Sequence, residues 1–126
     1  MNLPLQVNLK DKVCVVTGGA GVLGGYWSAA LAASGAKVAV LDRNLEFAQK
    51  KAEEITAEGG ICIGVQADVL NKESLKAAHE EVLAKFGPCE LLLNGAGGNH
   101  PRGTTTKEYL YEEDLLEENK DLFTFF

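Results

Sequence analysis

The segment from Thr17 to Gly24 has the composition of a loop that binds phosphate groups. It reads Thr-Gly-Gly-Ala-Gly-Val-Leu-Gly, so four of its eight residues are glycine. A short apolar run precedes it and a stretch with helical periodicity follows it. A diphosphate can approach the main chain at such a place, because the free N–H groups and dipole of a helix N-terminus favour negative charge and no Cβ blocks the approach. The segment therefore predicts a dinucleotide site, with a tight structural turn as the alternative.

An acidic residue stands where a dinucleotide site needs one. Asp42 lies 18 positions after Gly24, close to the usual spacing of about 20 residues. Its carboxylate can accept hydrogen bonds from the adenosine ribose hydroxyls and would repel a 2′-phosphate, so we predict NAD in preference to NADP. Arg43 keeps NADP open as the less favoured cofactor, because a guanidinium can bind that phosphate or stack on adenine. No Gly-Lys-Ser/Thr follows the glycines, which disfavours a nucleoside triphosphate loop.

The elements that would position these groups alternate along the chain. Apolar runs at residues 12–17, 37–41, 61–66 and 90–93 predict buried strands, and the stretches between them predict three helices. Glycines predict the helix ends, and Asn71 predicts the start of the third helix. This alternation predicts an α/β protein with a doubly wound parallel sheet and helices on both faces, the Rossmann fold. The expected apolar helix faces are Leu23, Trp27, Ala30 and Leu31, then Leu45, Ala48, Ala52 and Ile55, then Leu75, Ala78, Val82 and Phe86.

The composition excludes several classes of protein. A chain of 126 residues holds one compact domain or a large part of one, and 46% apolar with 24% charged residues is typical of a globular protein. A net charge of −6 without a basic run argues against a nucleic-acid partner. No membrane span and no secretory signal are evident, so we expect a cytoplasmic protein. Cys14, Cys62 and Cys89 are interpreted as buried reduced thiols, and no metal-ligand spacing is present.

The stretch after Gly103 departs from this pattern. It is strongly acidic from Glu108 to Asp121 and ends with Leu-Phe-Thr-Phe-Phe. We interpret residues 99–126 as an acidic loop or helix segment on the substrate side. The terminal phenylalanines need a partner surface, so either they pack back on the domain or the sequence is cut from a longer protein. With four predicted strands, we expect residues 1–126 to form a single NAD(P)-binding domain that is truncated after the fourth strand.

Four motifs together resemble the short-chain dehydrogenase/reductase family, from about Lys10 to Gly97. They are the glycine loop, Asp42 after the second strand, the residues 67–69 (Ala-Asp-Val) after the third, and the residues 94–97 (Asn-Gly-Ala-Gly) after the fourth. The resemblance implies an NAD(P)-dependent oxidoreductase that transfers a hydride between a nicotinamide and an alcohol or ketone. It also implies a homo-oligomer for the complete protein. Two positions depart from the family pattern: the loop glycine is Gly21 in place of position 22, and Gly95 replaces an asparagine.

The resemblance also implies roles for individual residues. Asp68 would meet the adenine amino group through its side chain, and Val69 would meet the adenine ring through its main chain. Without the resemblance, Asp68 is a helix-start acid and residues 94–97 are a tight loop. The residues that would face the diphosphate are Gly18, Gly21, Val22, Leu23 and Gly24, and those that would line the adenine-ribose and nicotinamide side are Asn94, Ala96 and Gly97.

The run from Asn94 to Pro101 is similar to a sugar-acid branch of the family, the D-mannonate oxidoreductases, which interconvert mannonate and fructuronate. This likeness suggests a sugar acid such as D-mannonate as the small-molecule substrate. His100 and Arg102 follow the fourth strand, where ligands bind in open α/β sheets. Arg102 would clamp a substrate carboxylate with two hydrogen bonds, and the alternative is an exposed loop arginine.

The catalytic group of the family is absent from these 126 residues. It is a Tyr followed four residues later by a Lys that lowers the Tyr pKa, so that the phenol can exchange a proton with the substrate oxygen. Four positions after Tyr26, Tyr109 and Tyr111 stand Ala, Glu and Leu. Three hypotheses follow: the cofactor-binding half of a larger oxidoreductase, a non-catalytic dinucleotide-binding module or redox sensor, and a flavodoxin-like binding domain. We favour the first.

Overall fold

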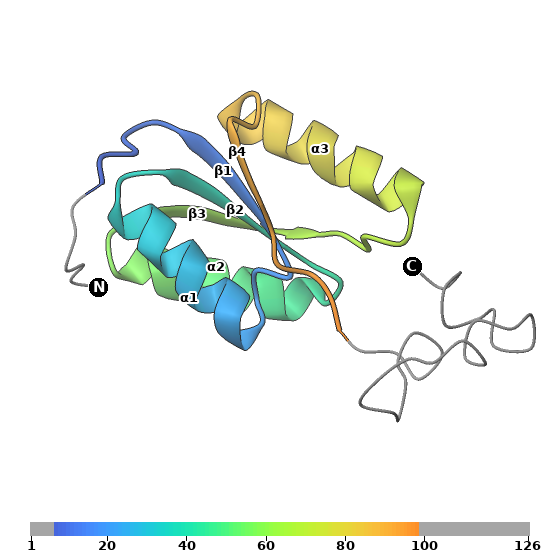
Figure 1. The fold of residues 1–126 in the computed structure, drawn as a ribbon. Coiled ribbons are helices and arrows are strands. Elements are labelled where there is room, and N and C mark those ends of the chain that lie inside the picture. Colours follow the sequence, from blue (N-terminus) through green and yellow to red (C-terminus); the bar gives the residue numbers. More distant parts are fainter. Residues whose placement is uncertain (1–6, 99–126) are drawn as a thin grey trace, which may run out of the picture. The chain divides into compact units, whose positions relative to one another are not determined.

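The computed structural model describes residues 7–98, and within them a four-stranded parallel sheet carries three helices (Figure 1). The chain divides into two compact units, Met1–Ala96 and Gly97–Phe126, and the first contains every element described below. The sheet order is β3-β2-β1-β4, so the predicted doubly wound α/β fold is confirmed. The elements are β1 (Val13–Thr17), α1 (Val22–Ala33), β2 (Lys37–Asp42), α2 (Leu45–Ala57), β3 (Ile61–Gln66), α3 (Lys72–Phe86) and β4 (Leu91–Asn94).

Helices cover both faces of the sheet. Figure 1 shows α1 and α2 on one side and α3 on the other. Successive residues of a strand point to opposite faces, so Cys14 and Val16 of β1 pack in the core under α1 and α2, whereas Val13 and Val15 pack in the core under α3. Burial on both sides explains why the strands are continuous apolar runs and do not alternate with polar residues.

The helix boundaries follow from local chemistry. Asn44 and Asn71 precede α2 and α3, and their side-chain oxygens accept hydrogen bonds from the N–H groups of Phe47 and Ser74. The chain then leaves the helices through glycines with positive φ, at +94° for Gly35, +91° for Gly59 and +96° for Gly87. The predicted cap at Asn71 and the predicted helix ends are therefore confirmed.

The predicted apolar face of α1 is wrong at Leu23 and Trp27, whereas Leu31 packs against the core under α1 and α2 as predicted. Leu23 is 65% exposed and Trp27 is 38% exposed, whereas small residues face the sheet. The reason at the start of α1 is the close approach of Gly24 to the preceding loop, where a Cβ would lie 2.1 Å from the Gly18 carbonyl oxygen and a large side chain has no room. The buried residues of α1 are Gly24, Gly25, Ser28 and Ala32. The faces of α2 and α3 are as predicted at Ala48, Ala52 and Ile55 and at Ala78 and Val82.

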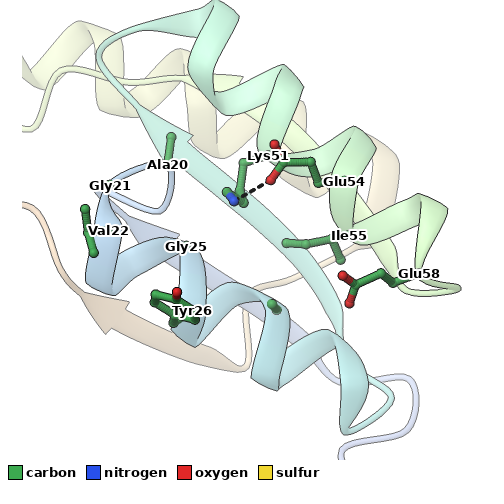
Figure 2. Close-up of a pocket in the computed structure, with 10 residues that line it drawn as sticks. Ala20, Gly21, Val22, Gly25, Tyr26, Lys51, Glu54, Ile55 and Glu58 are labelled. Atoms are coloured by element: carbon green, nitrogen blue, oxygen red, sulfur yellow. Dashed lines mark hydrogen bonds and ion pairs between the residues drawn. The ribbon is translucent and has the colours of Figure 1, made fainter. Parts of the chain in front are cut away.

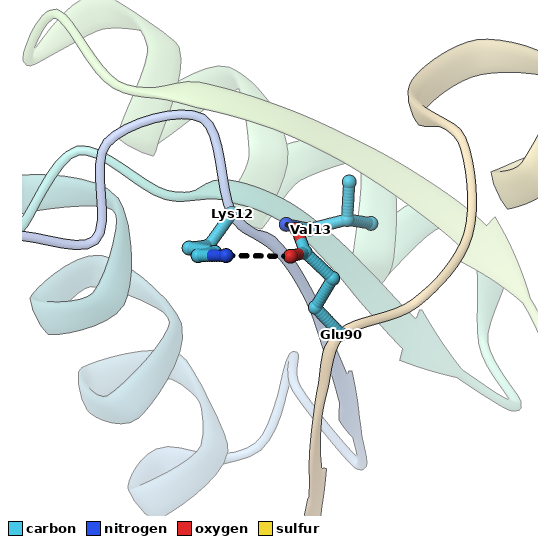
Figure 3. Close-up of polar contacts among 3 residues, drawn as sticks. All are labelled: Lys12, Val13 and Glu90. Carbon is cyan, nitrogen blue, oxygen red and sulfur yellow. Dashed lines mark hydrogen bonds and ion pairs between the residues drawn. The ribbon is translucent and has the colours of Figure 1, made fainter.

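The amino edge of the sheet is closed by a polar contact between β1 and the segment before β4. Glu90 accepts a hydrogen bond from the Lys12 ammonium at 2.7 Å and another from the N–H of Val13 at 3.2 Å (Figure 3). Both contacts hold the pKa of the Glu90 carboxyl below its usual value, the Lys12 bond more than the Val13 bond. The Lys12 ammonium, the Val13 N–H and the Glu90 carboxylate therefore find their hydrogen-bond partners within the chain.

The three cysteines differ in exposure. Cys14 is buried, Cys62 is half-buried and Cys89 is exposed, so the interpretation of all three as buried thiols is wrong for Cys89. Cys89 lies in the turn before β4, outside the packed faces of the sheet. Burial raises the pKa of the Cys62 thiol to about 12. Among residues 7–98, no helix has the length and apolar character that a membrane crossing requires.

Candidate cofactor-binding site

The strand order creates a crevice at the carboxyl edge of the sheet. The chain runs outward from β1 to β2 and β3, then crosses back to place β4 on the other side of β1. The loops after β1 and β4 therefore leave the same edge next to one another and in different directions. Open α/β sheets bind ligands at this kind of switch point. The first glycine cluster and Gly95, the start of the second, lie there.

The two glycine loops are in direct contact. Gly18 has a φ of +64°, and a Cβ added to it would lie 2.9 Å from the Ala96 main chain. Thr17 connects the same loops, because its Oγ1 accepts hydrogen bonds from the N–H groups of Gly95 and Ala96, both at 3.2 Å. The predictions from the sequence included Thr17 in the glycine loop but gave its side chain no role, although its position directly before the first glycine is a usable signal.

Gly24 allows α1 to begin unusually close to the loop. A Cβ at this position would lie 2.1 Å from the Gly18 carbonyl oxygen. No side chain fits at that distance, so glycine is required by space rather than by backbone conformation. This close approach turns the first turn of α1 toward the carboxyl edge of the sheet.

The N-terminus of α1 is left open. Its cap residue is Gly21, which has no side chain to accept a hydrogen bond, and the first turn contains no acidic residue. The first N–H groups of a helix have no acceptor inside the helix, so those of Val22, Leu23 and Gly24 remain available. The side chains of Val22 and Leu23 are 80% and 65% exposed. The arrangement fits an anion such as a diphosphate.

The second departure from the family pattern has a local explanation. A Cβ at Gly95 would lie 2.8 Å from the Thr17 carbonyl oxygen and 3.0 Å from the Trp27 ring. Trp27 of α1 thus occupies the space that a side chain at position 95 would need. An asparagine at this position is incompatible with Trp27 in its present place.

Asp42 joins the end of β2 to the glycine loop. Its Oδ2 accepts a hydrogen bond from the Ala20 N–H at 3.3 Å, and its Oδ1 accepts one from the Asn44 N–H at 3.1 Å. A carboxylate has further lone pairs, so it can accept ribose hydroxyls as well. Arg43 is exposed beside it, and its carbonyl oxygen accepts a hydrogen bond from Gln66. The predictions omitted the role of Ala20, since a main-chain donor leaves no mark in the residue type.

The turn after β3 has its own internal bonds. The Asp68 N–H donates to Ser74 Oγ at 2.9 Å, and the Asp68 carboxylate accepts a hydrogen bond from the Leu70 N–H at 3.0 Å. Asp68 is half-buried and Val69 is 41% exposed. The Asp68 carboxylate therefore already stabilises the turn before α3, with capacity left for an adenine amino group.

Several predicted residues cannot be placed with this group. Asn94 ends β4 in register with Thr17, so it does lie at this edge, but Gly97 is exposed in the second unit. His100, Arg102 and the whole segment 99–126 lie outside the described residues. In the part of the chain that the structure describes, no three His, Cys, Asp or Glu side chains gather as a metal site would require. The predicted residues brought together at the carboxyl edge are Gly18, Gly21, Val22, Leu23, Gly24, Asp42, Asn94 and Ala96.

Curated relatives share this sequence over most of the chain. An uncharacterised oxidoreductase of Bacillus subtilis is 50% identical over 111 residues, which are 88% of this chain and 40% of that protein. The D-threitol dehydrogenase of Mycolicibacterium smegmatis is 34% identical over 97 residues, covering 77% of this chain and 37% of that protein. The chain thus spans about two fifths of the length of these relatives.

A solved structure supports the same relationship. A Haemophilus influenzae protein, provisionally named a D-mannonate oxidoreductase and solved with bound NAD, matches with a TM-score of 0.74 and 39% identity. The match covers 92% of this chain and 41% of that one. The family model for the short chain dehydrogenases matches residues 12–118. The parallel sheet, the glycine loop at its switch point and these matches agree, and the chain belongs to the short-chain dehydrogenase/reductase family.

Proposed function

We propose that the protein is an NAD-dependent oxidoreductase that transfers a hydride between the nicotinamide and an alcohol or ketone. The observation that carries the proposal is the open N-terminus of α1, whose free N–H groups and missing acid leave a place for the cofactor diphosphate. The glycines support it, because a Cβ at Gly18 or Gly24 would collide with neighbouring main chain. Family membership supports the oxidoreductase class.

Each part of the chain would contribute one interaction. The N–H groups at the start of α1 bind the diphosphate, and Asp42 accepts the adenosine ribose hydroxyls while it holds the Ala20 N–H. Asp68 and Val69 recognise adenine, and residues 94–97 line the path toward the nicotinamide. The nicotinamide itself supplies the hydride chemistry when bound. Proton transfer requires the family's Tyr and Lys, which these 126 residues do not contain.

The preference for NAD over NADP rests on Asp42. A 2′-phosphate would face this carboxylate, which the Ala20 and Asn44 N–H groups hold in place. We expect wild-type protein to bind NAD more tightly than NADP in parallel fluorescence titrations. Asp42→Asn should lose most of this preference because it removes the repulsion and keeps an oxygen acceptor. Tighter binding of NADP than of NAD by wild type would reverse the assignment.

A sugar acid is the proposed substrate class. The support is the similarity of residues 94–101 to the sugar-acid branch and the provisional name of the Haemophilus neighbour. His100 and Arg102 are the proposed substrate residues, with Arg102 as the carboxylate clamp. The test is a panel of sugar acids and matched neutral sugars given to the full-length protein and followed by NADH absorbance. An Arg102→Ala variant with an unchanged KM for the acid would contradict the clamp.

A non-catalytic dinucleotide-binding module is the second candidate. One observation favours it: no Tyr of the chain has a Lys four positions later. Such a module would bind NAD with normal affinity and, assayed as the full-length protein, would show no turnover with any substrate of the panel. A flavodoxin-like domain would bind neither dinucleotide. Homo-oligomerisation and a cytoplasmic location stay predictions, which light scattering and cell fractionation would test.

A further inference from the structure

A groove between α1 and α2 adjoins the glycine loop (Figure 2). Its cavity volume is about 620 Å³, and both helices line it. Ala20, Gly21 and Val22 form its end at the loop, so the groove shares these residues with the candidate cofactor site. The functions assigned above use only this end of the groove.

Lys51 of α2 brings a cation into the groove. Its side chain lies against Gly25 of α1, where an added Cβ would come within 3.1 Å of Lys51 Cε and 3.6 Å of its Nζ. Only 29% of the Lys51 side chain is exposed. The absence of a side chain at position 25 therefore gives the lysine stem a surface to lie on, and the ammonium stays close to α1.

Glu54 already pairs with this cation. The Lys51 ammonium donates to Glu54 Oε2 at 2.5 Å, one helical turn along α2, and Figure 2 shows the two groups directed toward each other. The hydrogen bond from Lys51, and then its charge, holds the pKa of the Glu54 carboxyl below its usual value. Glu54 is therefore ionised at neutral pH and neutralises Lys51, the one lysine among the described residues that line the groove.

Asp42 places the ribose next to the loop end of the groove. Its Oδ2 is 3.3 Å from the N–H nitrogen of Ala20, which itself lines the groove. A 2′-phosphate on a ribose bound at Asp42 would be repelled by the carboxylate and would turn toward any cation nearby. Lys51 is the cation on the groove side, and Arg43 is the cation on the exposed side.

We propose that Lys51 and Glu54, together with Asp42, set the preference for NAD over NADP. Glu54 withholds the Lys51 ammonium from a 2′-phosphate, and Glu58 adds a second carboxylate to the groove lining, so the groove offers that phosphate no net positive charge. The pair acts on specificity and leaves the diphosphate contacts of α1 unchanged. The inference rests on the proposed function, because it requires the adenosine to bind at Asp42.

The test is Glu54→Gln, titrated with NAD and NADP at low ionic strength. We expect the Kd for NADP to fall about two- to fivefold, the range that exposed ion pairs contribute, while the Kd for NAD stays unchanged. Glu53→Gln is the matched control, because it removes the same charge from the same helix at an exposed residue that does not line the groove. The double variant Lys51→Met/Glu54→Gln should lose the gain.

Each outcome decides the question. An unchanged Kd for NADP with Glu54→Gln overturns the proposal, as does an equal gain with Glu53→Gln or a gain that persists in the double variant. The last two results would assign the effect to net charge alone. Thermal unfolding of every variant verifies that it is folded. If wild type binds neither dinucleotide, the proposed function fails, and this proposal fails with it.

Discussion

The three helices begin at the same edge of the sheet, yet α1 begins differently from α2 and α3. Asn44 caps α2 and Asn71 caps α3, and each first turn contains an acid, Glu46 or Glu73. The start of α1 has neither a side-chain cap nor an acid. Three elements of one fold, in equivalent positions, thus carry opposite chemistry at their N-termini.

This difference between the helix starts indicates which of them stabilise the fold and which is available to a ligand. A helix N-terminus needs acceptors for its free N–H groups and negative charge for its dipole. Helices α2 and α3 find both within the chain, so their starts contribute to stability without a ligand. Helix α1 has neither the acceptor nor the negative charge within the part of the chain that the structure describes, so a bound ligand would have to supply them. Its close contact with Gly18 also excludes a side chain at Gly24. The contrast predicts which substitutions affect cofactor binding and which affect only folding.

The largest effect is expected from a substitution that adds a side chain at the uncapped N-terminus of α1. Gly24→Ala would place a Cβ 2.1 Å from the Gly18 carbonyl oxygen, so the loop and the helix would have to move apart. We expect NAD affinity to fall about a hundredfold and the free energy of unfolding to fall by about 2–3 kcal/mol, as overpacking does. Titration with NAD and urea unfolding measure the two effects.

A second glycine provides the control for this variant. Gly59 has a φ of +91° and open space around its missing Cβ. Gly59→Ala should cost about 1 kcal/mol through backbone strain alone and leave NAD affinity unchanged. Wild-type NAD affinity in Gly24→Ala would show that the close approach of α1 to the loop is not needed for binding.

A carboxylate introduced in the first turn of α1 should raise the stability of the free protein and lower its affinity for NAD. Val22 is 80% exposed at the first position of the helix, so Val22→Asp introduces charge without a packing change. We expect the free protein to gain about 0.5 kcal/mol from the helix dipole, and NAD affinity to fall about tenfold because the new charge opposes the diphosphate. The reverse change on α2, Glu46→Gln, should cost a similar amount of stability and leave NAD affinity unaltered. Equal NAD affinity in Val22→Asp and wild type would place the diphosphate elsewhere.

Substitution of Asn71, the cap residue of α3, tests whether the start of that helix affects stability without affecting NAD binding. Asn71→Ala removes the acceptor of the Ser74 N–H and should lower the free energy of unfolding by about 1 kcal/mol. Asn71→Asp should restore most of this loss, because a carboxylate caps as well as an amide. NAD affinity should follow neither change. Urea unfolding with and without NAD separates the two readouts, and a cap variant that binds NAD more weakly than its rescue would contradict the assignment of α3 to stability.

Local signals explain how much of the fold could be predicted. The third strand was predicted at its observed bounds, Ile61–Gln66, and Asn71 and Gly87 mark the ends of α3 as expected. These features depend on neighbouring residues along the chain, which the sequence displays. The inner face of α1 depends on how closely Gly24 approaches Gly18, a contact between elements that hydrophobic periodicity does not encode.

In the candidate site, too, features set by local spacing were predicted and contacts between separate elements were not. The glycine loop and Asp42 were predicted from spacing, and the structure places them at one edge. The bonds of Thr17 and Ala20 were not predicted, because each pairs a side chain of one element with a main-chain N–H of another, and a main-chain donor leaves no mark in the residue type. Lys51 was likewise hidden, since its place in the groove depends on Gly25 of a different helix.

The smallest expected effect lies at the opposite edge of the sheet, where the polar groups are satisfied from within. Glu90 accepts hydrogen bonds from the Lys12 ammonium and the Val13 N–H, so Glu90→Gln should lower stability slightly at neutral pH and leave NAD affinity unchanged. The pKa values of Glu90 and Lys12 define the pH range over which wild type is more stable than Glu90→Gln. The pKa of Glu90 is lowered from an ordinary value of 4.5, so its contribution is present above that pH and is lost as the pH falls through the lowered pKa.

The pKa of Lys12 is raised from 10.5, because the hydrogen bond and then the charge of Glu90 favour the ammonium. Its contribution is therefore complete below that pH and is lost as the pH rises through the raised pKa. The stability difference between wild type and Glu90→Gln should thus form a plateau between about pH 5 and pH 10 and shrink at both ends. Added salt should reduce the plateau, since both groups face solvent. Urea unfolding across this range measures it, and a difference that grows as the pH falls would mean that Glu90 is not the charged partner at this edge.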